Sequence, residues 1–194
     1  GYRYFETFAK EQVKYPFGFG LSYTEFELTD IATDYTTEDV YVTATVNNKG
    51  AVAGKEVVQV YVSPAQGKLG RPMRELVGFT KTEVIEPGKT ETVEIQIPFS
   101  SLATFDDSGV TGFANCEVLE AGEYEFYIGS NVRDCVKAGV LEIEETEVIQ
   151  ECKDILMPVQ AFDRIRPNIK DGVVAVAKEA TPLASKTMKE RRLE

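Results

Sequence analysis

The sequence predicts an all-β fold, a two-layer antiparallel β-sandwich with an irregular C-terminal extension. Between residues 24 and 150, segments in which Val, Ile, Tyr or Thr alternate with polar residues recur about every ten residues, with turn signals between them. One segment in the middle, Glu56–Val62, is apolar on both faces. About seven to nine such segments are typical of a sandwich, in which each strand buries one face against the opposite sheet.

The run EVVQVYV at Glu56–Val62 predicts the central strand. Its even-numbered valines, such as Val60, point to one side, and on the other side only Gln59 is clearly polar. A strand that is covered on both faces lies in the interior of a sheet. We therefore expect the other strands to be its neighbours.

The remaining strands are predicted from alternation and turn chemistry. A strand runs from Phe26 to Ile31 with a break near Thr29-Asp30, and a strictly alternating, half-buried strand covers Val40–Asn47. The tetrapeptide Glu86-Pro87-Gly88-Lys89 has Pro second and Gly third, as a type II turn requires. The other expectations are a turn at Asn47–Gly50, a loop at Pro64–Pro72, one long or two short strands in Arg74–Ile85, a strand at Val93–Ile97, a helical turn or strand at Ser100–Phe105, a turn at Asp106–Gly109, a weak strand at Gly112–Val118, and strands at Tyr124–Gly129 and Val140–Ile149. This succession fits the immunoglobulin or fibronectin type III kind of sandwich.

Three regions follow from the change of character along the chain. Residues 1–14 are mixed and charged and are interpreted as the end of a preceding region, because the chain begins without an initiator Met. Residues 15–150 form the sandwich. Residues 151–194 are a tail or connector punctuated by Pro, in which only Gly172–Ala177 is strand-like and Lys186–Arg192 has helical character.

The loop Tyr15–Tyr23, YPFGFGLSY, carries the candidate contact residues. Tyr15, Phe17, Phe19 and Tyr23 lie among Pro16 and two glycines. Such aromatics bury large areas against whatever they touch. The loop is either packed on the sandwich or a surface that docks on a neighbouring domain. Arg71 and Arg74, beside the central strand, are candidate polar partners in such a contact, or part of a solvated loop.

Composition restricts the partners and the chemistry. The net charge is −11 over 194 residues, which argues against nucleic acid and against an anionic membrane, and no apolar run is long enough to span a bilayer. The chain has no His, and its three cysteines, Cys116, Cys135 and Cys152, are too far apart for a CxxC site. The odd number of cysteines favours reduced, structural thiols over a Cys116–Cys135 bridge, and reduced thiols favour a cytoplasmic location. We expect no cofactor and no metal.

Acidic clusters are the remaining candidates for catalysis. There are two such clusters, Asp106-Asp107 and Glu144-Glu145 with Glu147. Adjacent residues on a strand point to opposite faces, so neighbouring carboxyl groups in a cluster do not face each other. Glycoside hydrolysis needs two carboxyl groups facing each other at about 5–9.5 Å. No residue is therefore predicted to be catalytic.

The stretch YPFGFGLSYTEF resembles the start of the fibronectin type III-like domain of glycoside hydrolase family 3, the β-glucosidases and their relatives. The later stretches VTATVNNKGAVAGKEVVQVYVSP, RPMRELVGFTKTEVIEPGKTETVEIQIP and EAGEYEFYIGSNVRD extend the resemblance over residues 15–143. The segment Met157–Leu183 is similar to the connector of members with permuted domain order.

The resemblance implies a non-catalytic accessory domain that braces the catalytic domains of the same parent chain. The family's nucleophile and acid/base lie on other domains, so no catalytic residue is carried over, and an oligosaccharide is met only indirectly. The alternatives are a carbohydrate-binding module that uses exposed Tyr residues and a general interaction domain. Aromatics in a flat exposed row would favour sugar binding, whereas aromatics gathered in the core or in the loop Tyr15–Tyr23 would favour bracing.

Overall fold

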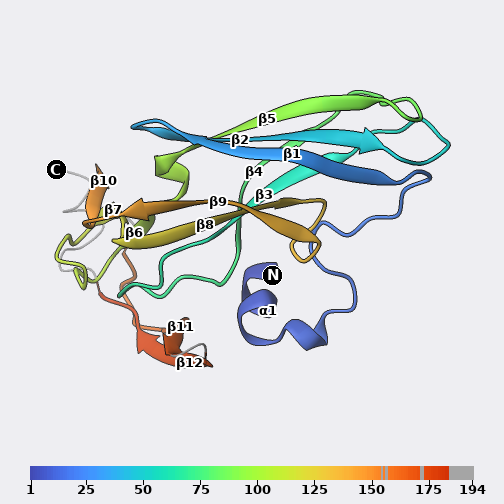
Figure 1. The fold of residues 1–194 in the computed structure, drawn as a ribbon. Coiled ribbons are helices and arrows are strands. Elements are labelled where there is room, and N and C mark those ends of the chain that lie inside the picture. Colours follow the sequence, from blue (N-terminus) through green and yellow to red (C-terminus); the bar gives the residue numbers. More distant parts are fainter. Residues whose placement is uncertain (154, 156, 171–172, 184–194) are drawn as a thin grey trace.

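The structure is a computed structural model that describes residues 1–153, 155, 157–170 and 173–183. Two antiparallel sheets face each other across a single core (Figure 1). The first has the order β1-β2-β5, and the second has the order β4-β3-β8-β9. Their strands are β1 (Phe26–Tyr35), β2 (Asp39–Asn48), β5 (Thr90–Pro98), β4 (Glu75–Lys81), β3 (Val57–Ser63), β8 (Gly122–Gly129) and β9 (Cys135–Ile143). The predicted antiparallel sandwich is confirmed.

Strand β3 lies in the interior of the four-stranded sheet. Val60 pairs with Gly78 of β4 and with Ile128 of β8, and its side chain is completely buried between the sheets. On the opposite face, Gln59 and Tyr61 are also buried. The prediction of a central strand covered on both sides is confirmed.

The three-stranded sheet follows the predicted alternation. In β2, Val40, Val42, Ala44 and Val46 are fully buried while their neighbours are half-exposed. The predicted break in β1 is a register shift between Thr29 and Ala32, where Asp30 has a φ of 49°. The predicted type II turn is present: Gly88 has a φ of 71°, and the Lys89 N–H donates to the Glu86 carbonyl at 3.0 Å.

A small third sheet lies at one end of the sandwich, and here the sequence was less informative. It has the order β10-β7-β6, with β6 (Thr104–Asp106), β7 (Cys116–Leu119) and β10 (Glu147–Glu151). The single strand expected at Val140–Ile149 is wrong, because the chain leaves the four-stranded sheet after β9 and joins this sheet as β10. The weak strand expected at Gly112–Val118 begins only at Cys116, after Asn115 with a φ of 60°. The segment Ser100–Phe105 contains both alternatives, the end of a 3₁₀ turn (Phe99–Ser101) and the start of β6.

Residues 1–14 pack against the outer face of the four-stranded sheet. They form helix α1 (Tyr2–Phe8) and a 3₁₀ turn (Lys10–Gln12). Figure 1 shows α1 below β3, on the side away from the three-stranded sheet. The ring of Tyr2 meets that of Tyr61 edge-on, with centroids 6.4 Å apart. This helix is the cover on the second face of β3.

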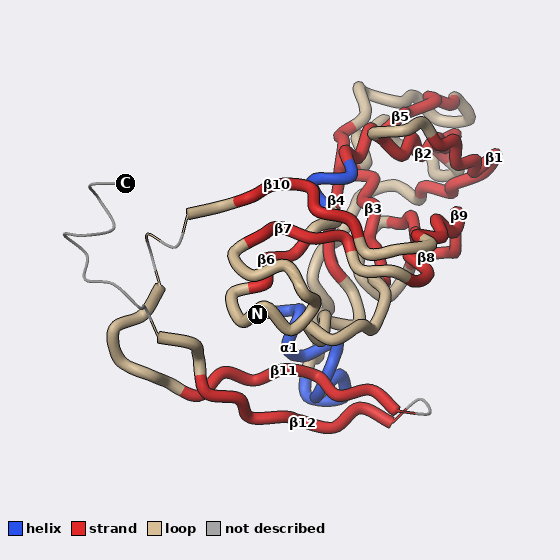
Figure 2. Tube along the Cα trace, turned by 90° about the vertical axis from the view of Figure 1, so that its left-hand side faces the viewer, coloured by secondary structure: helices blue, strands red, loops and turns tan. Residues whose placement is uncertain are grey.

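The C-terminal region contains an antiparallel hairpin that belongs to neither sandwich sheet. Strands β11 (Asp163–Lys170) and β12 (Val173–Ala180) pair only with each other (Figure 2). The strand expected at Gly172–Ala177 corresponds to β12, except for Gly172, which lies outside the described residues; β11 was not expected. The helical character expected at Lys186–Arg192 also falls outside them. None of the described helices has the length and apolar character needed to cross a membrane.

Candidate interdomain contact surface

The aromatic loop, Tyr15–Tyr23, is fixed to the sandwich through its first half. The Val132 N–H donates to the carbonyl of Phe17 at 3.0 Å, and the Phe19 N–H donates to the carbonyl of Pro16 at 3.0 Å. Gly18 has a φ of 87°, and a Cβ added there would lie 2.7 Å from Oε1 of Gln59. Only glycine therefore allows the loop to lie this close to the sheet.

The aromatic side chains of this loop are largely exposed. The exposed fraction is 61% for Tyr15, 42% for Phe17, 44% for Phe19 and 97% for Tyr23. The rings of Tyr15 and Phe19 contact each other at 5.0 Å between centroids, and Phe17 stacks on Tyr2 at 4.4 Å. The structure thus pairs Tyr15 with Phe19 and Phe17 with Tyr2 of α1, and leaves the loop aromatics open to solvent.

Arg71 is not part of this exposed group. Its exposed fraction is 6%, and its guanidinium pairs with Glu75 at 2.8 Å. It also donates to the carbonyl of Leu102 at 2.8 Å. A buried charge needs such partners, and here both lie within the chain.

Arg74 is likewise engaged inside the chain. Its guanidinium carbon lies 3.7 Å from the centroid of the Tyr127 ring, a cation–π contact, and Nη1 donates to Sγ of Cys135 at 3.0 Å. Burial raises the pKa of the Cys135 thiol, and the nearby Arg74 charge offsets only part of that rise. Cys135 is therefore a neutral, structural thiol.

The contacts of residues 1–14 were not predicted from the sequence. Arg133 forms a forked ion pair with Glu6, with Nη2 and Oε1 2.9 Å apart, and the Met73 N–H donates to Oγ1 of Thr7 at 3.0 Å. The spacing of Tyr4 and Phe8, whose rings lie 5.3 Å apart, is the one helical signal in this segment. The aromatic loop and α1 thus form one surface on the outer side of the four-stranded sheet.

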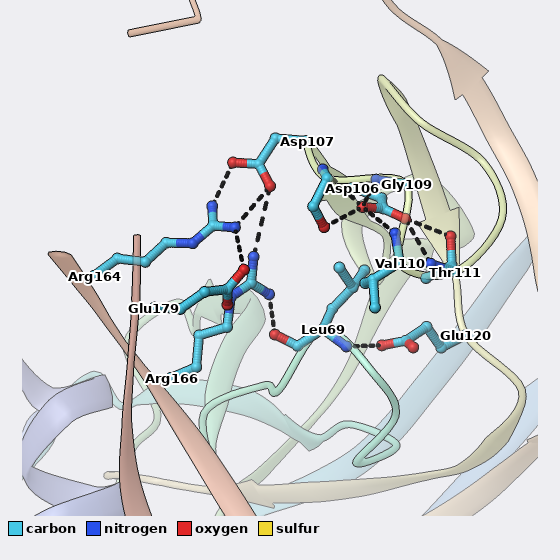
Figure 3. Close-up of polar contacts among 11 residues, drawn as sticks. Leu69, Asp106, Asp107, Gly109, Val110, Thr111, Glu120, Arg164, Arg166 and Glu179 are labelled. Atoms are coloured by element: carbon cyan, nitrogen blue, oxygen red, sulfur yellow. Dashed lines mark hydrogen bonds and ion pairs between the residues drawn. The ribbon is translucent and has the colours of Figure 1, made fainter. Parts of the chain in front are cut away.

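The Asp106 carboxylate organises the loop between β6 and β7. It is fully buried and accepts hydrogen bonds from the backbone N–H groups of residues 108–111 and from the hydroxyls of Ser108 and Thr111 (Figure 3). Burial would raise the pKa of Asp106, but the hydrogen bonds from Thr111 and Ser108 outweigh it and lower the pKa to about 2. Its oxygens are directed at this loop, so its role is structural.

The neighbouring acidic residues have separate surroundings. Asp107 is ion-paired with Arg164, and Figure 3 shows its carboxylate directed away from that of Asp106. Glu144, Glu145 and Glu147 are exposed. In the described ranges, no group of three or more Cys, Asp or Glu side chains is placed to hold a metal ion.

Comparison with known proteins identifies the sandwich. Residues 56–132 match the family model of the fibronectin type III-like domain. A β-glucosidase of Ruminococcus albus is 44% identical over the whole chain, which spans 20% of that protein. β-Glucosidase A of Butyrivibrio fibrisolvens is 37% identical over 94% of the chain, which spans 24% of its length. The chain therefore spans a fifth to a quarter of these relatives.

Solved structures give the same relationship. A β-glucosidase from Paenibacillus barengoltzii superimposes with a TM-score of 0.91 at 36% identity, over 98% of this chain and 22% of that one. β-Glucosidase 3B from Thermotoga neapolitana, solved in complex with α-D-glucose, has a TM-score of 0.68 at 40% identity over 76% of this chain and 19% of its own. A glycoside hydrolase family 3 (GH3) β-glucosidase of Bifidobacterium adolescentis gives a TM-score of 0.65 at 34% identity. The chain therefore contains a fibronectin type III-like domain and corresponds to a small part of the length of glycoside hydrolase family 3 β-glucosidases.

Proposed function

We propose that the chain is a non-catalytic bracing domain of a larger enzyme that hydrolyses β-glucosidic bonds. Its partners are the catalytic domains of the same polypeptide, and the aromatic loop is the surface that docks on them. Residues 151–194 are the connector of this domain. The observation that carries the proposal is the exposure of the aromatic loop in a chain that spans only 20% of a related β-glucosidase.

The distribution of exposed aromatic residues supports docking over direct sugar binding. Of the ten exposed aromatic side chains among the described residues, five lie between residues 4 and 23. They gather on α1 and the aromatic loop, which do not form a flat row on a sheet face. A group of exposed apolar side chains larger than a few hundred Å² marks an interface.

A bracing contact affects catalysis through geometry. Two catalytic domains that share a substrate must hold their reacting groups in register, and a misplacement of about 1 Å can cost on the order of 100-fold in rate. A third domain that contacts both limits such movement. The contact contributes no reacting group of its own.

The test compares the same substitutions in the isolated chain and in the full-length enzyme that carries it. Phe19→Ala and Tyr23→Ala should leave the melting temperature of the isolated chain within about 2 °C, because exposed side chains contribute little to stability. In the full-length enzyme they should lower kcat/KM on an aryl β-glucoside by about tenfold or more. Phe17→Ala should lower stability in both, because it also removes the stack on Tyr2.

Phe113→Ala is the matched control. Phe113 is 40% exposed, close to the value for Phe19, and lies in the loop between β6 and β7, outside the aromatic loop. Its removal should change neither the isolated chain nor the activity of the full-length enzyme. Equal effects of the loop and control variants, or full activity in the loop variants, would contradict docking by the aromatic loop.

A further inference from the structure

The β11–β12 hairpin is attached to the sandwich without a share of its core. Neither hydrophobic cluster of the described residues contains a side chain beyond Ile149. On the outward face of the hairpin, Ile165 is 51% exposed and Val176 is 52% exposed. A two-stranded hairpin is at best marginally stable alone in water. Some other contact must therefore hold it in place.

Helix α1 lies close to β12, and an ion-pair cluster on the inward face of the hairpin joins it to the sandwich. Alternation along β11 places Arg164 and Arg166 on this face, and Glu179 lies opposite Arg164 on β12. Glu179 joins both arginines, 3.1 Å from Nη2 of Arg164 and 2.9 Å from Nε of Arg166. Across the gap, Asp107 binds both of them, with Oδ1 2.8 Å from Nη2 of Arg164 and 3.6 Å from Nη2 of Arg166 (Figure 3).

Two further contacts seat the hairpin beside the loop 64–72. Arg166 donates a hydrogen bond to the carbonyl of Leu69. Gly70 has a φ of 63°, and a Cβ at this position would lie 2.7 Å from the carbonyl oxygen of Pro167. The two backbones therefore approach too closely for any residue other than glycine.

Asp107 is the group of this cluster that belongs to the sandwich, and its position does not depend on the hairpin. The hydrogen bonds to Asp106 hold the loop that carries it. Its side chain is 18% exposed, and those of Arg164 and Arg166 are 21% and 17% exposed. With Asp107 and Glu179 the cluster is neutral, whereas loss of Asp107 leaves two partly buried guanidinium groups facing one carboxylate. A partly buried charge without its partner is costly.

We infer that Asp107 is the latch of the β11–β12 hairpin, the polar contact on which stable attachment of this arm to the sandwich depends. While latched, the arm has a fixed direction relative to the two sheets. In a parent enzyme this direction would set where the chain leads, a consequence that rests on the proposed function. The latch itself is a property of the 194-residue chain.

The test is hydrogen exchange of the 194-residue chain, followed by mass spectrometry of peptides from the hairpin and from the sandwich. Asp107→Asn keeps the size of the side chain and removes its charge. We expect exchange in 163–170 and 176–180 to become about tenfold faster, an effect between those of an exposed and a fully buried ion pair. Exchange in β3 and β8 should be unchanged, because the core does not involve the hairpin.

Asp34→Asn is the matched control, since it removes the same charge from an exposed position on β1. It should leave hairpin exchange as in the parent sequence. Arg164→Gln should reproduce the effect of Asp107→Asn, and the double variant should be little worse than either single one, because both remove the same contact. Trypsin gives a second readout: cleavage after Arg164 should be faster in Asp107→Asn, because the strand must open to be cut.

Unchanged hairpin exchange in Asp107→Asn would overturn the latch, and so would fully additive effects in the double variant. Equal acceleration in the hairpin and in β3 would also overturn it, because the hairpin would then not be released separately. These outcomes are independent of the aromatic loop, which is tested by the activity of the full-length enzyme. The two proposals can therefore fail separately. Hairpin exchange can be unchanged in Asp107→Asn while the loop variants lose activity, or hairpin exchange can accelerate while the loop variants stay fully active.

Discussion

At the scale of single residues, the buried carboxylate of Asp106 stabilises a loop. The sequence, in which Asp106 is one of two adjacent acidic residues, does not indicate this role. Asp106 and Asp107 are adjacent, yet one is enclosed by N–H and O–H donors of its own loop and the other forms ion pairs with the hairpin. Six hydrogen bonds converge on Asp106. The charged form is favoured by these donors, and protonation therefore opposes folding.

This predicts an acid-sensitive contribution to stability. The pKa of Asp106 is about 2 in the folded chain against an ordinary value of 3.8, so its contribution is complete above pH 4 and is lost as the pH falls towards 2. The loss is on the order of 2 kcal/mol of unfolding free energy. Asp106→Asn should lower stability at pH 7 by about 2 kcal/mol, because an amide nitrogen cannot accept the bonds from Thr111. Urea unfolding from pH 7 to pH 2 measures both effects.

Asp106→Asn should also lack this part of the pH dependence. Its unfolding free energy should therefore approach that of the parent sequence as the pH falls towards 2. Asp34→Asn, on the exposed face of β1, provides the comparison. Parallel curves for the parent sequence and Asp106→Asn between pH 4 and pH 2 would show that the hydrogen bonds to Asp106 do not lower its pKa.

At the scale of elements, the sequence predicts a strand correctly where that strand buries one face. It fails where tertiary contacts determine the local structure. The alternation in β2 and the turn at Glu86–Lys89 are local signals, and both were predicted correctly. Helix α1 carries only a weak local signal, the spacing of Tyr4 and Phe8: it has seven residues, no side-chain hydrogen bond at its N-cap and no acidic residue in its first turn. It forms against the sheet, through contacts such as Arg133 with Glu6.

The candidate contact surface was predictable only in part, for the same reason. Aromatic content alone identified the loop Tyr15–Tyr23. Burial of Arg71 could not be inferred, because it depends on the carbonyl of Leu102, which is distant in the sequence, as well as on the nearby Glu75. Strand β11 was missed because its pattern is interrupted by Pro167 and its inward face is charged.

The turn at Glu86–Lys89 provides a test at this scale. Gly88 has a φ of 71°, and a Cβ there would meet no atom within 4 Å. Gly88→Ala should therefore cost about 1–2 kcal/mol through backbone strain alone. Gly20→Ala is the matched control, because its Cβ would also be free of contacts while its φ is not positive. Thermal melting of the two variants should differ by several degrees; equal melting temperatures would exclude a strained conformation at Gly88.

At the scale of the whole molecule, the sandwich is a three-layer assembly once residues 1–14 are included. The three-stranded sheet covers one face of the four-stranded sheet, and α1 covers part of the other (Figure 1). Tyr2 connects the layers, since its ring stacks on Phe17, meets Tyr61 edge-on, and accepts a hydrogen bond from the Leu76 N–H at 2.7 Å. Helix α1 keeps Tyr61 out of water, and the aromatic loop at Gly18 covers Gln59.

Removal of residues 1–14 should therefore leave a folded but weakened sandwich. The core between the two sheets stays intact, while Tyr61 becomes exposed and Arg133 loses Glu6. We expect the unfolding free energy to fall by about 2–4 kcal/mol, as for loss of one buried aromatic contact together with an ion pair. Chemical denaturation of the truncated and complete chains measures the difference. Identical denaturation midpoints would mean that the packing of α1 on the sheet contributes nothing measurable to stability.

The pairing of β3 with β8 sets the order in which this architecture can be completed during synthesis. Val60 and Ile128 are neighbours in the sheet but far apart along the chain, so their contact requires closure of a long loop. Within this stretch of chain, the aromatic residues of α1 and the aromatic loop leave the ribosome before β8 and before the loop that carries Val132 and Arg133. Until then the ring of Phe17 and the uncovered side of β3 face water together, and a nascent chain in this state is open to aggregation. Residues 1–23 are thus synthesised before β8 but complete their packing only after it.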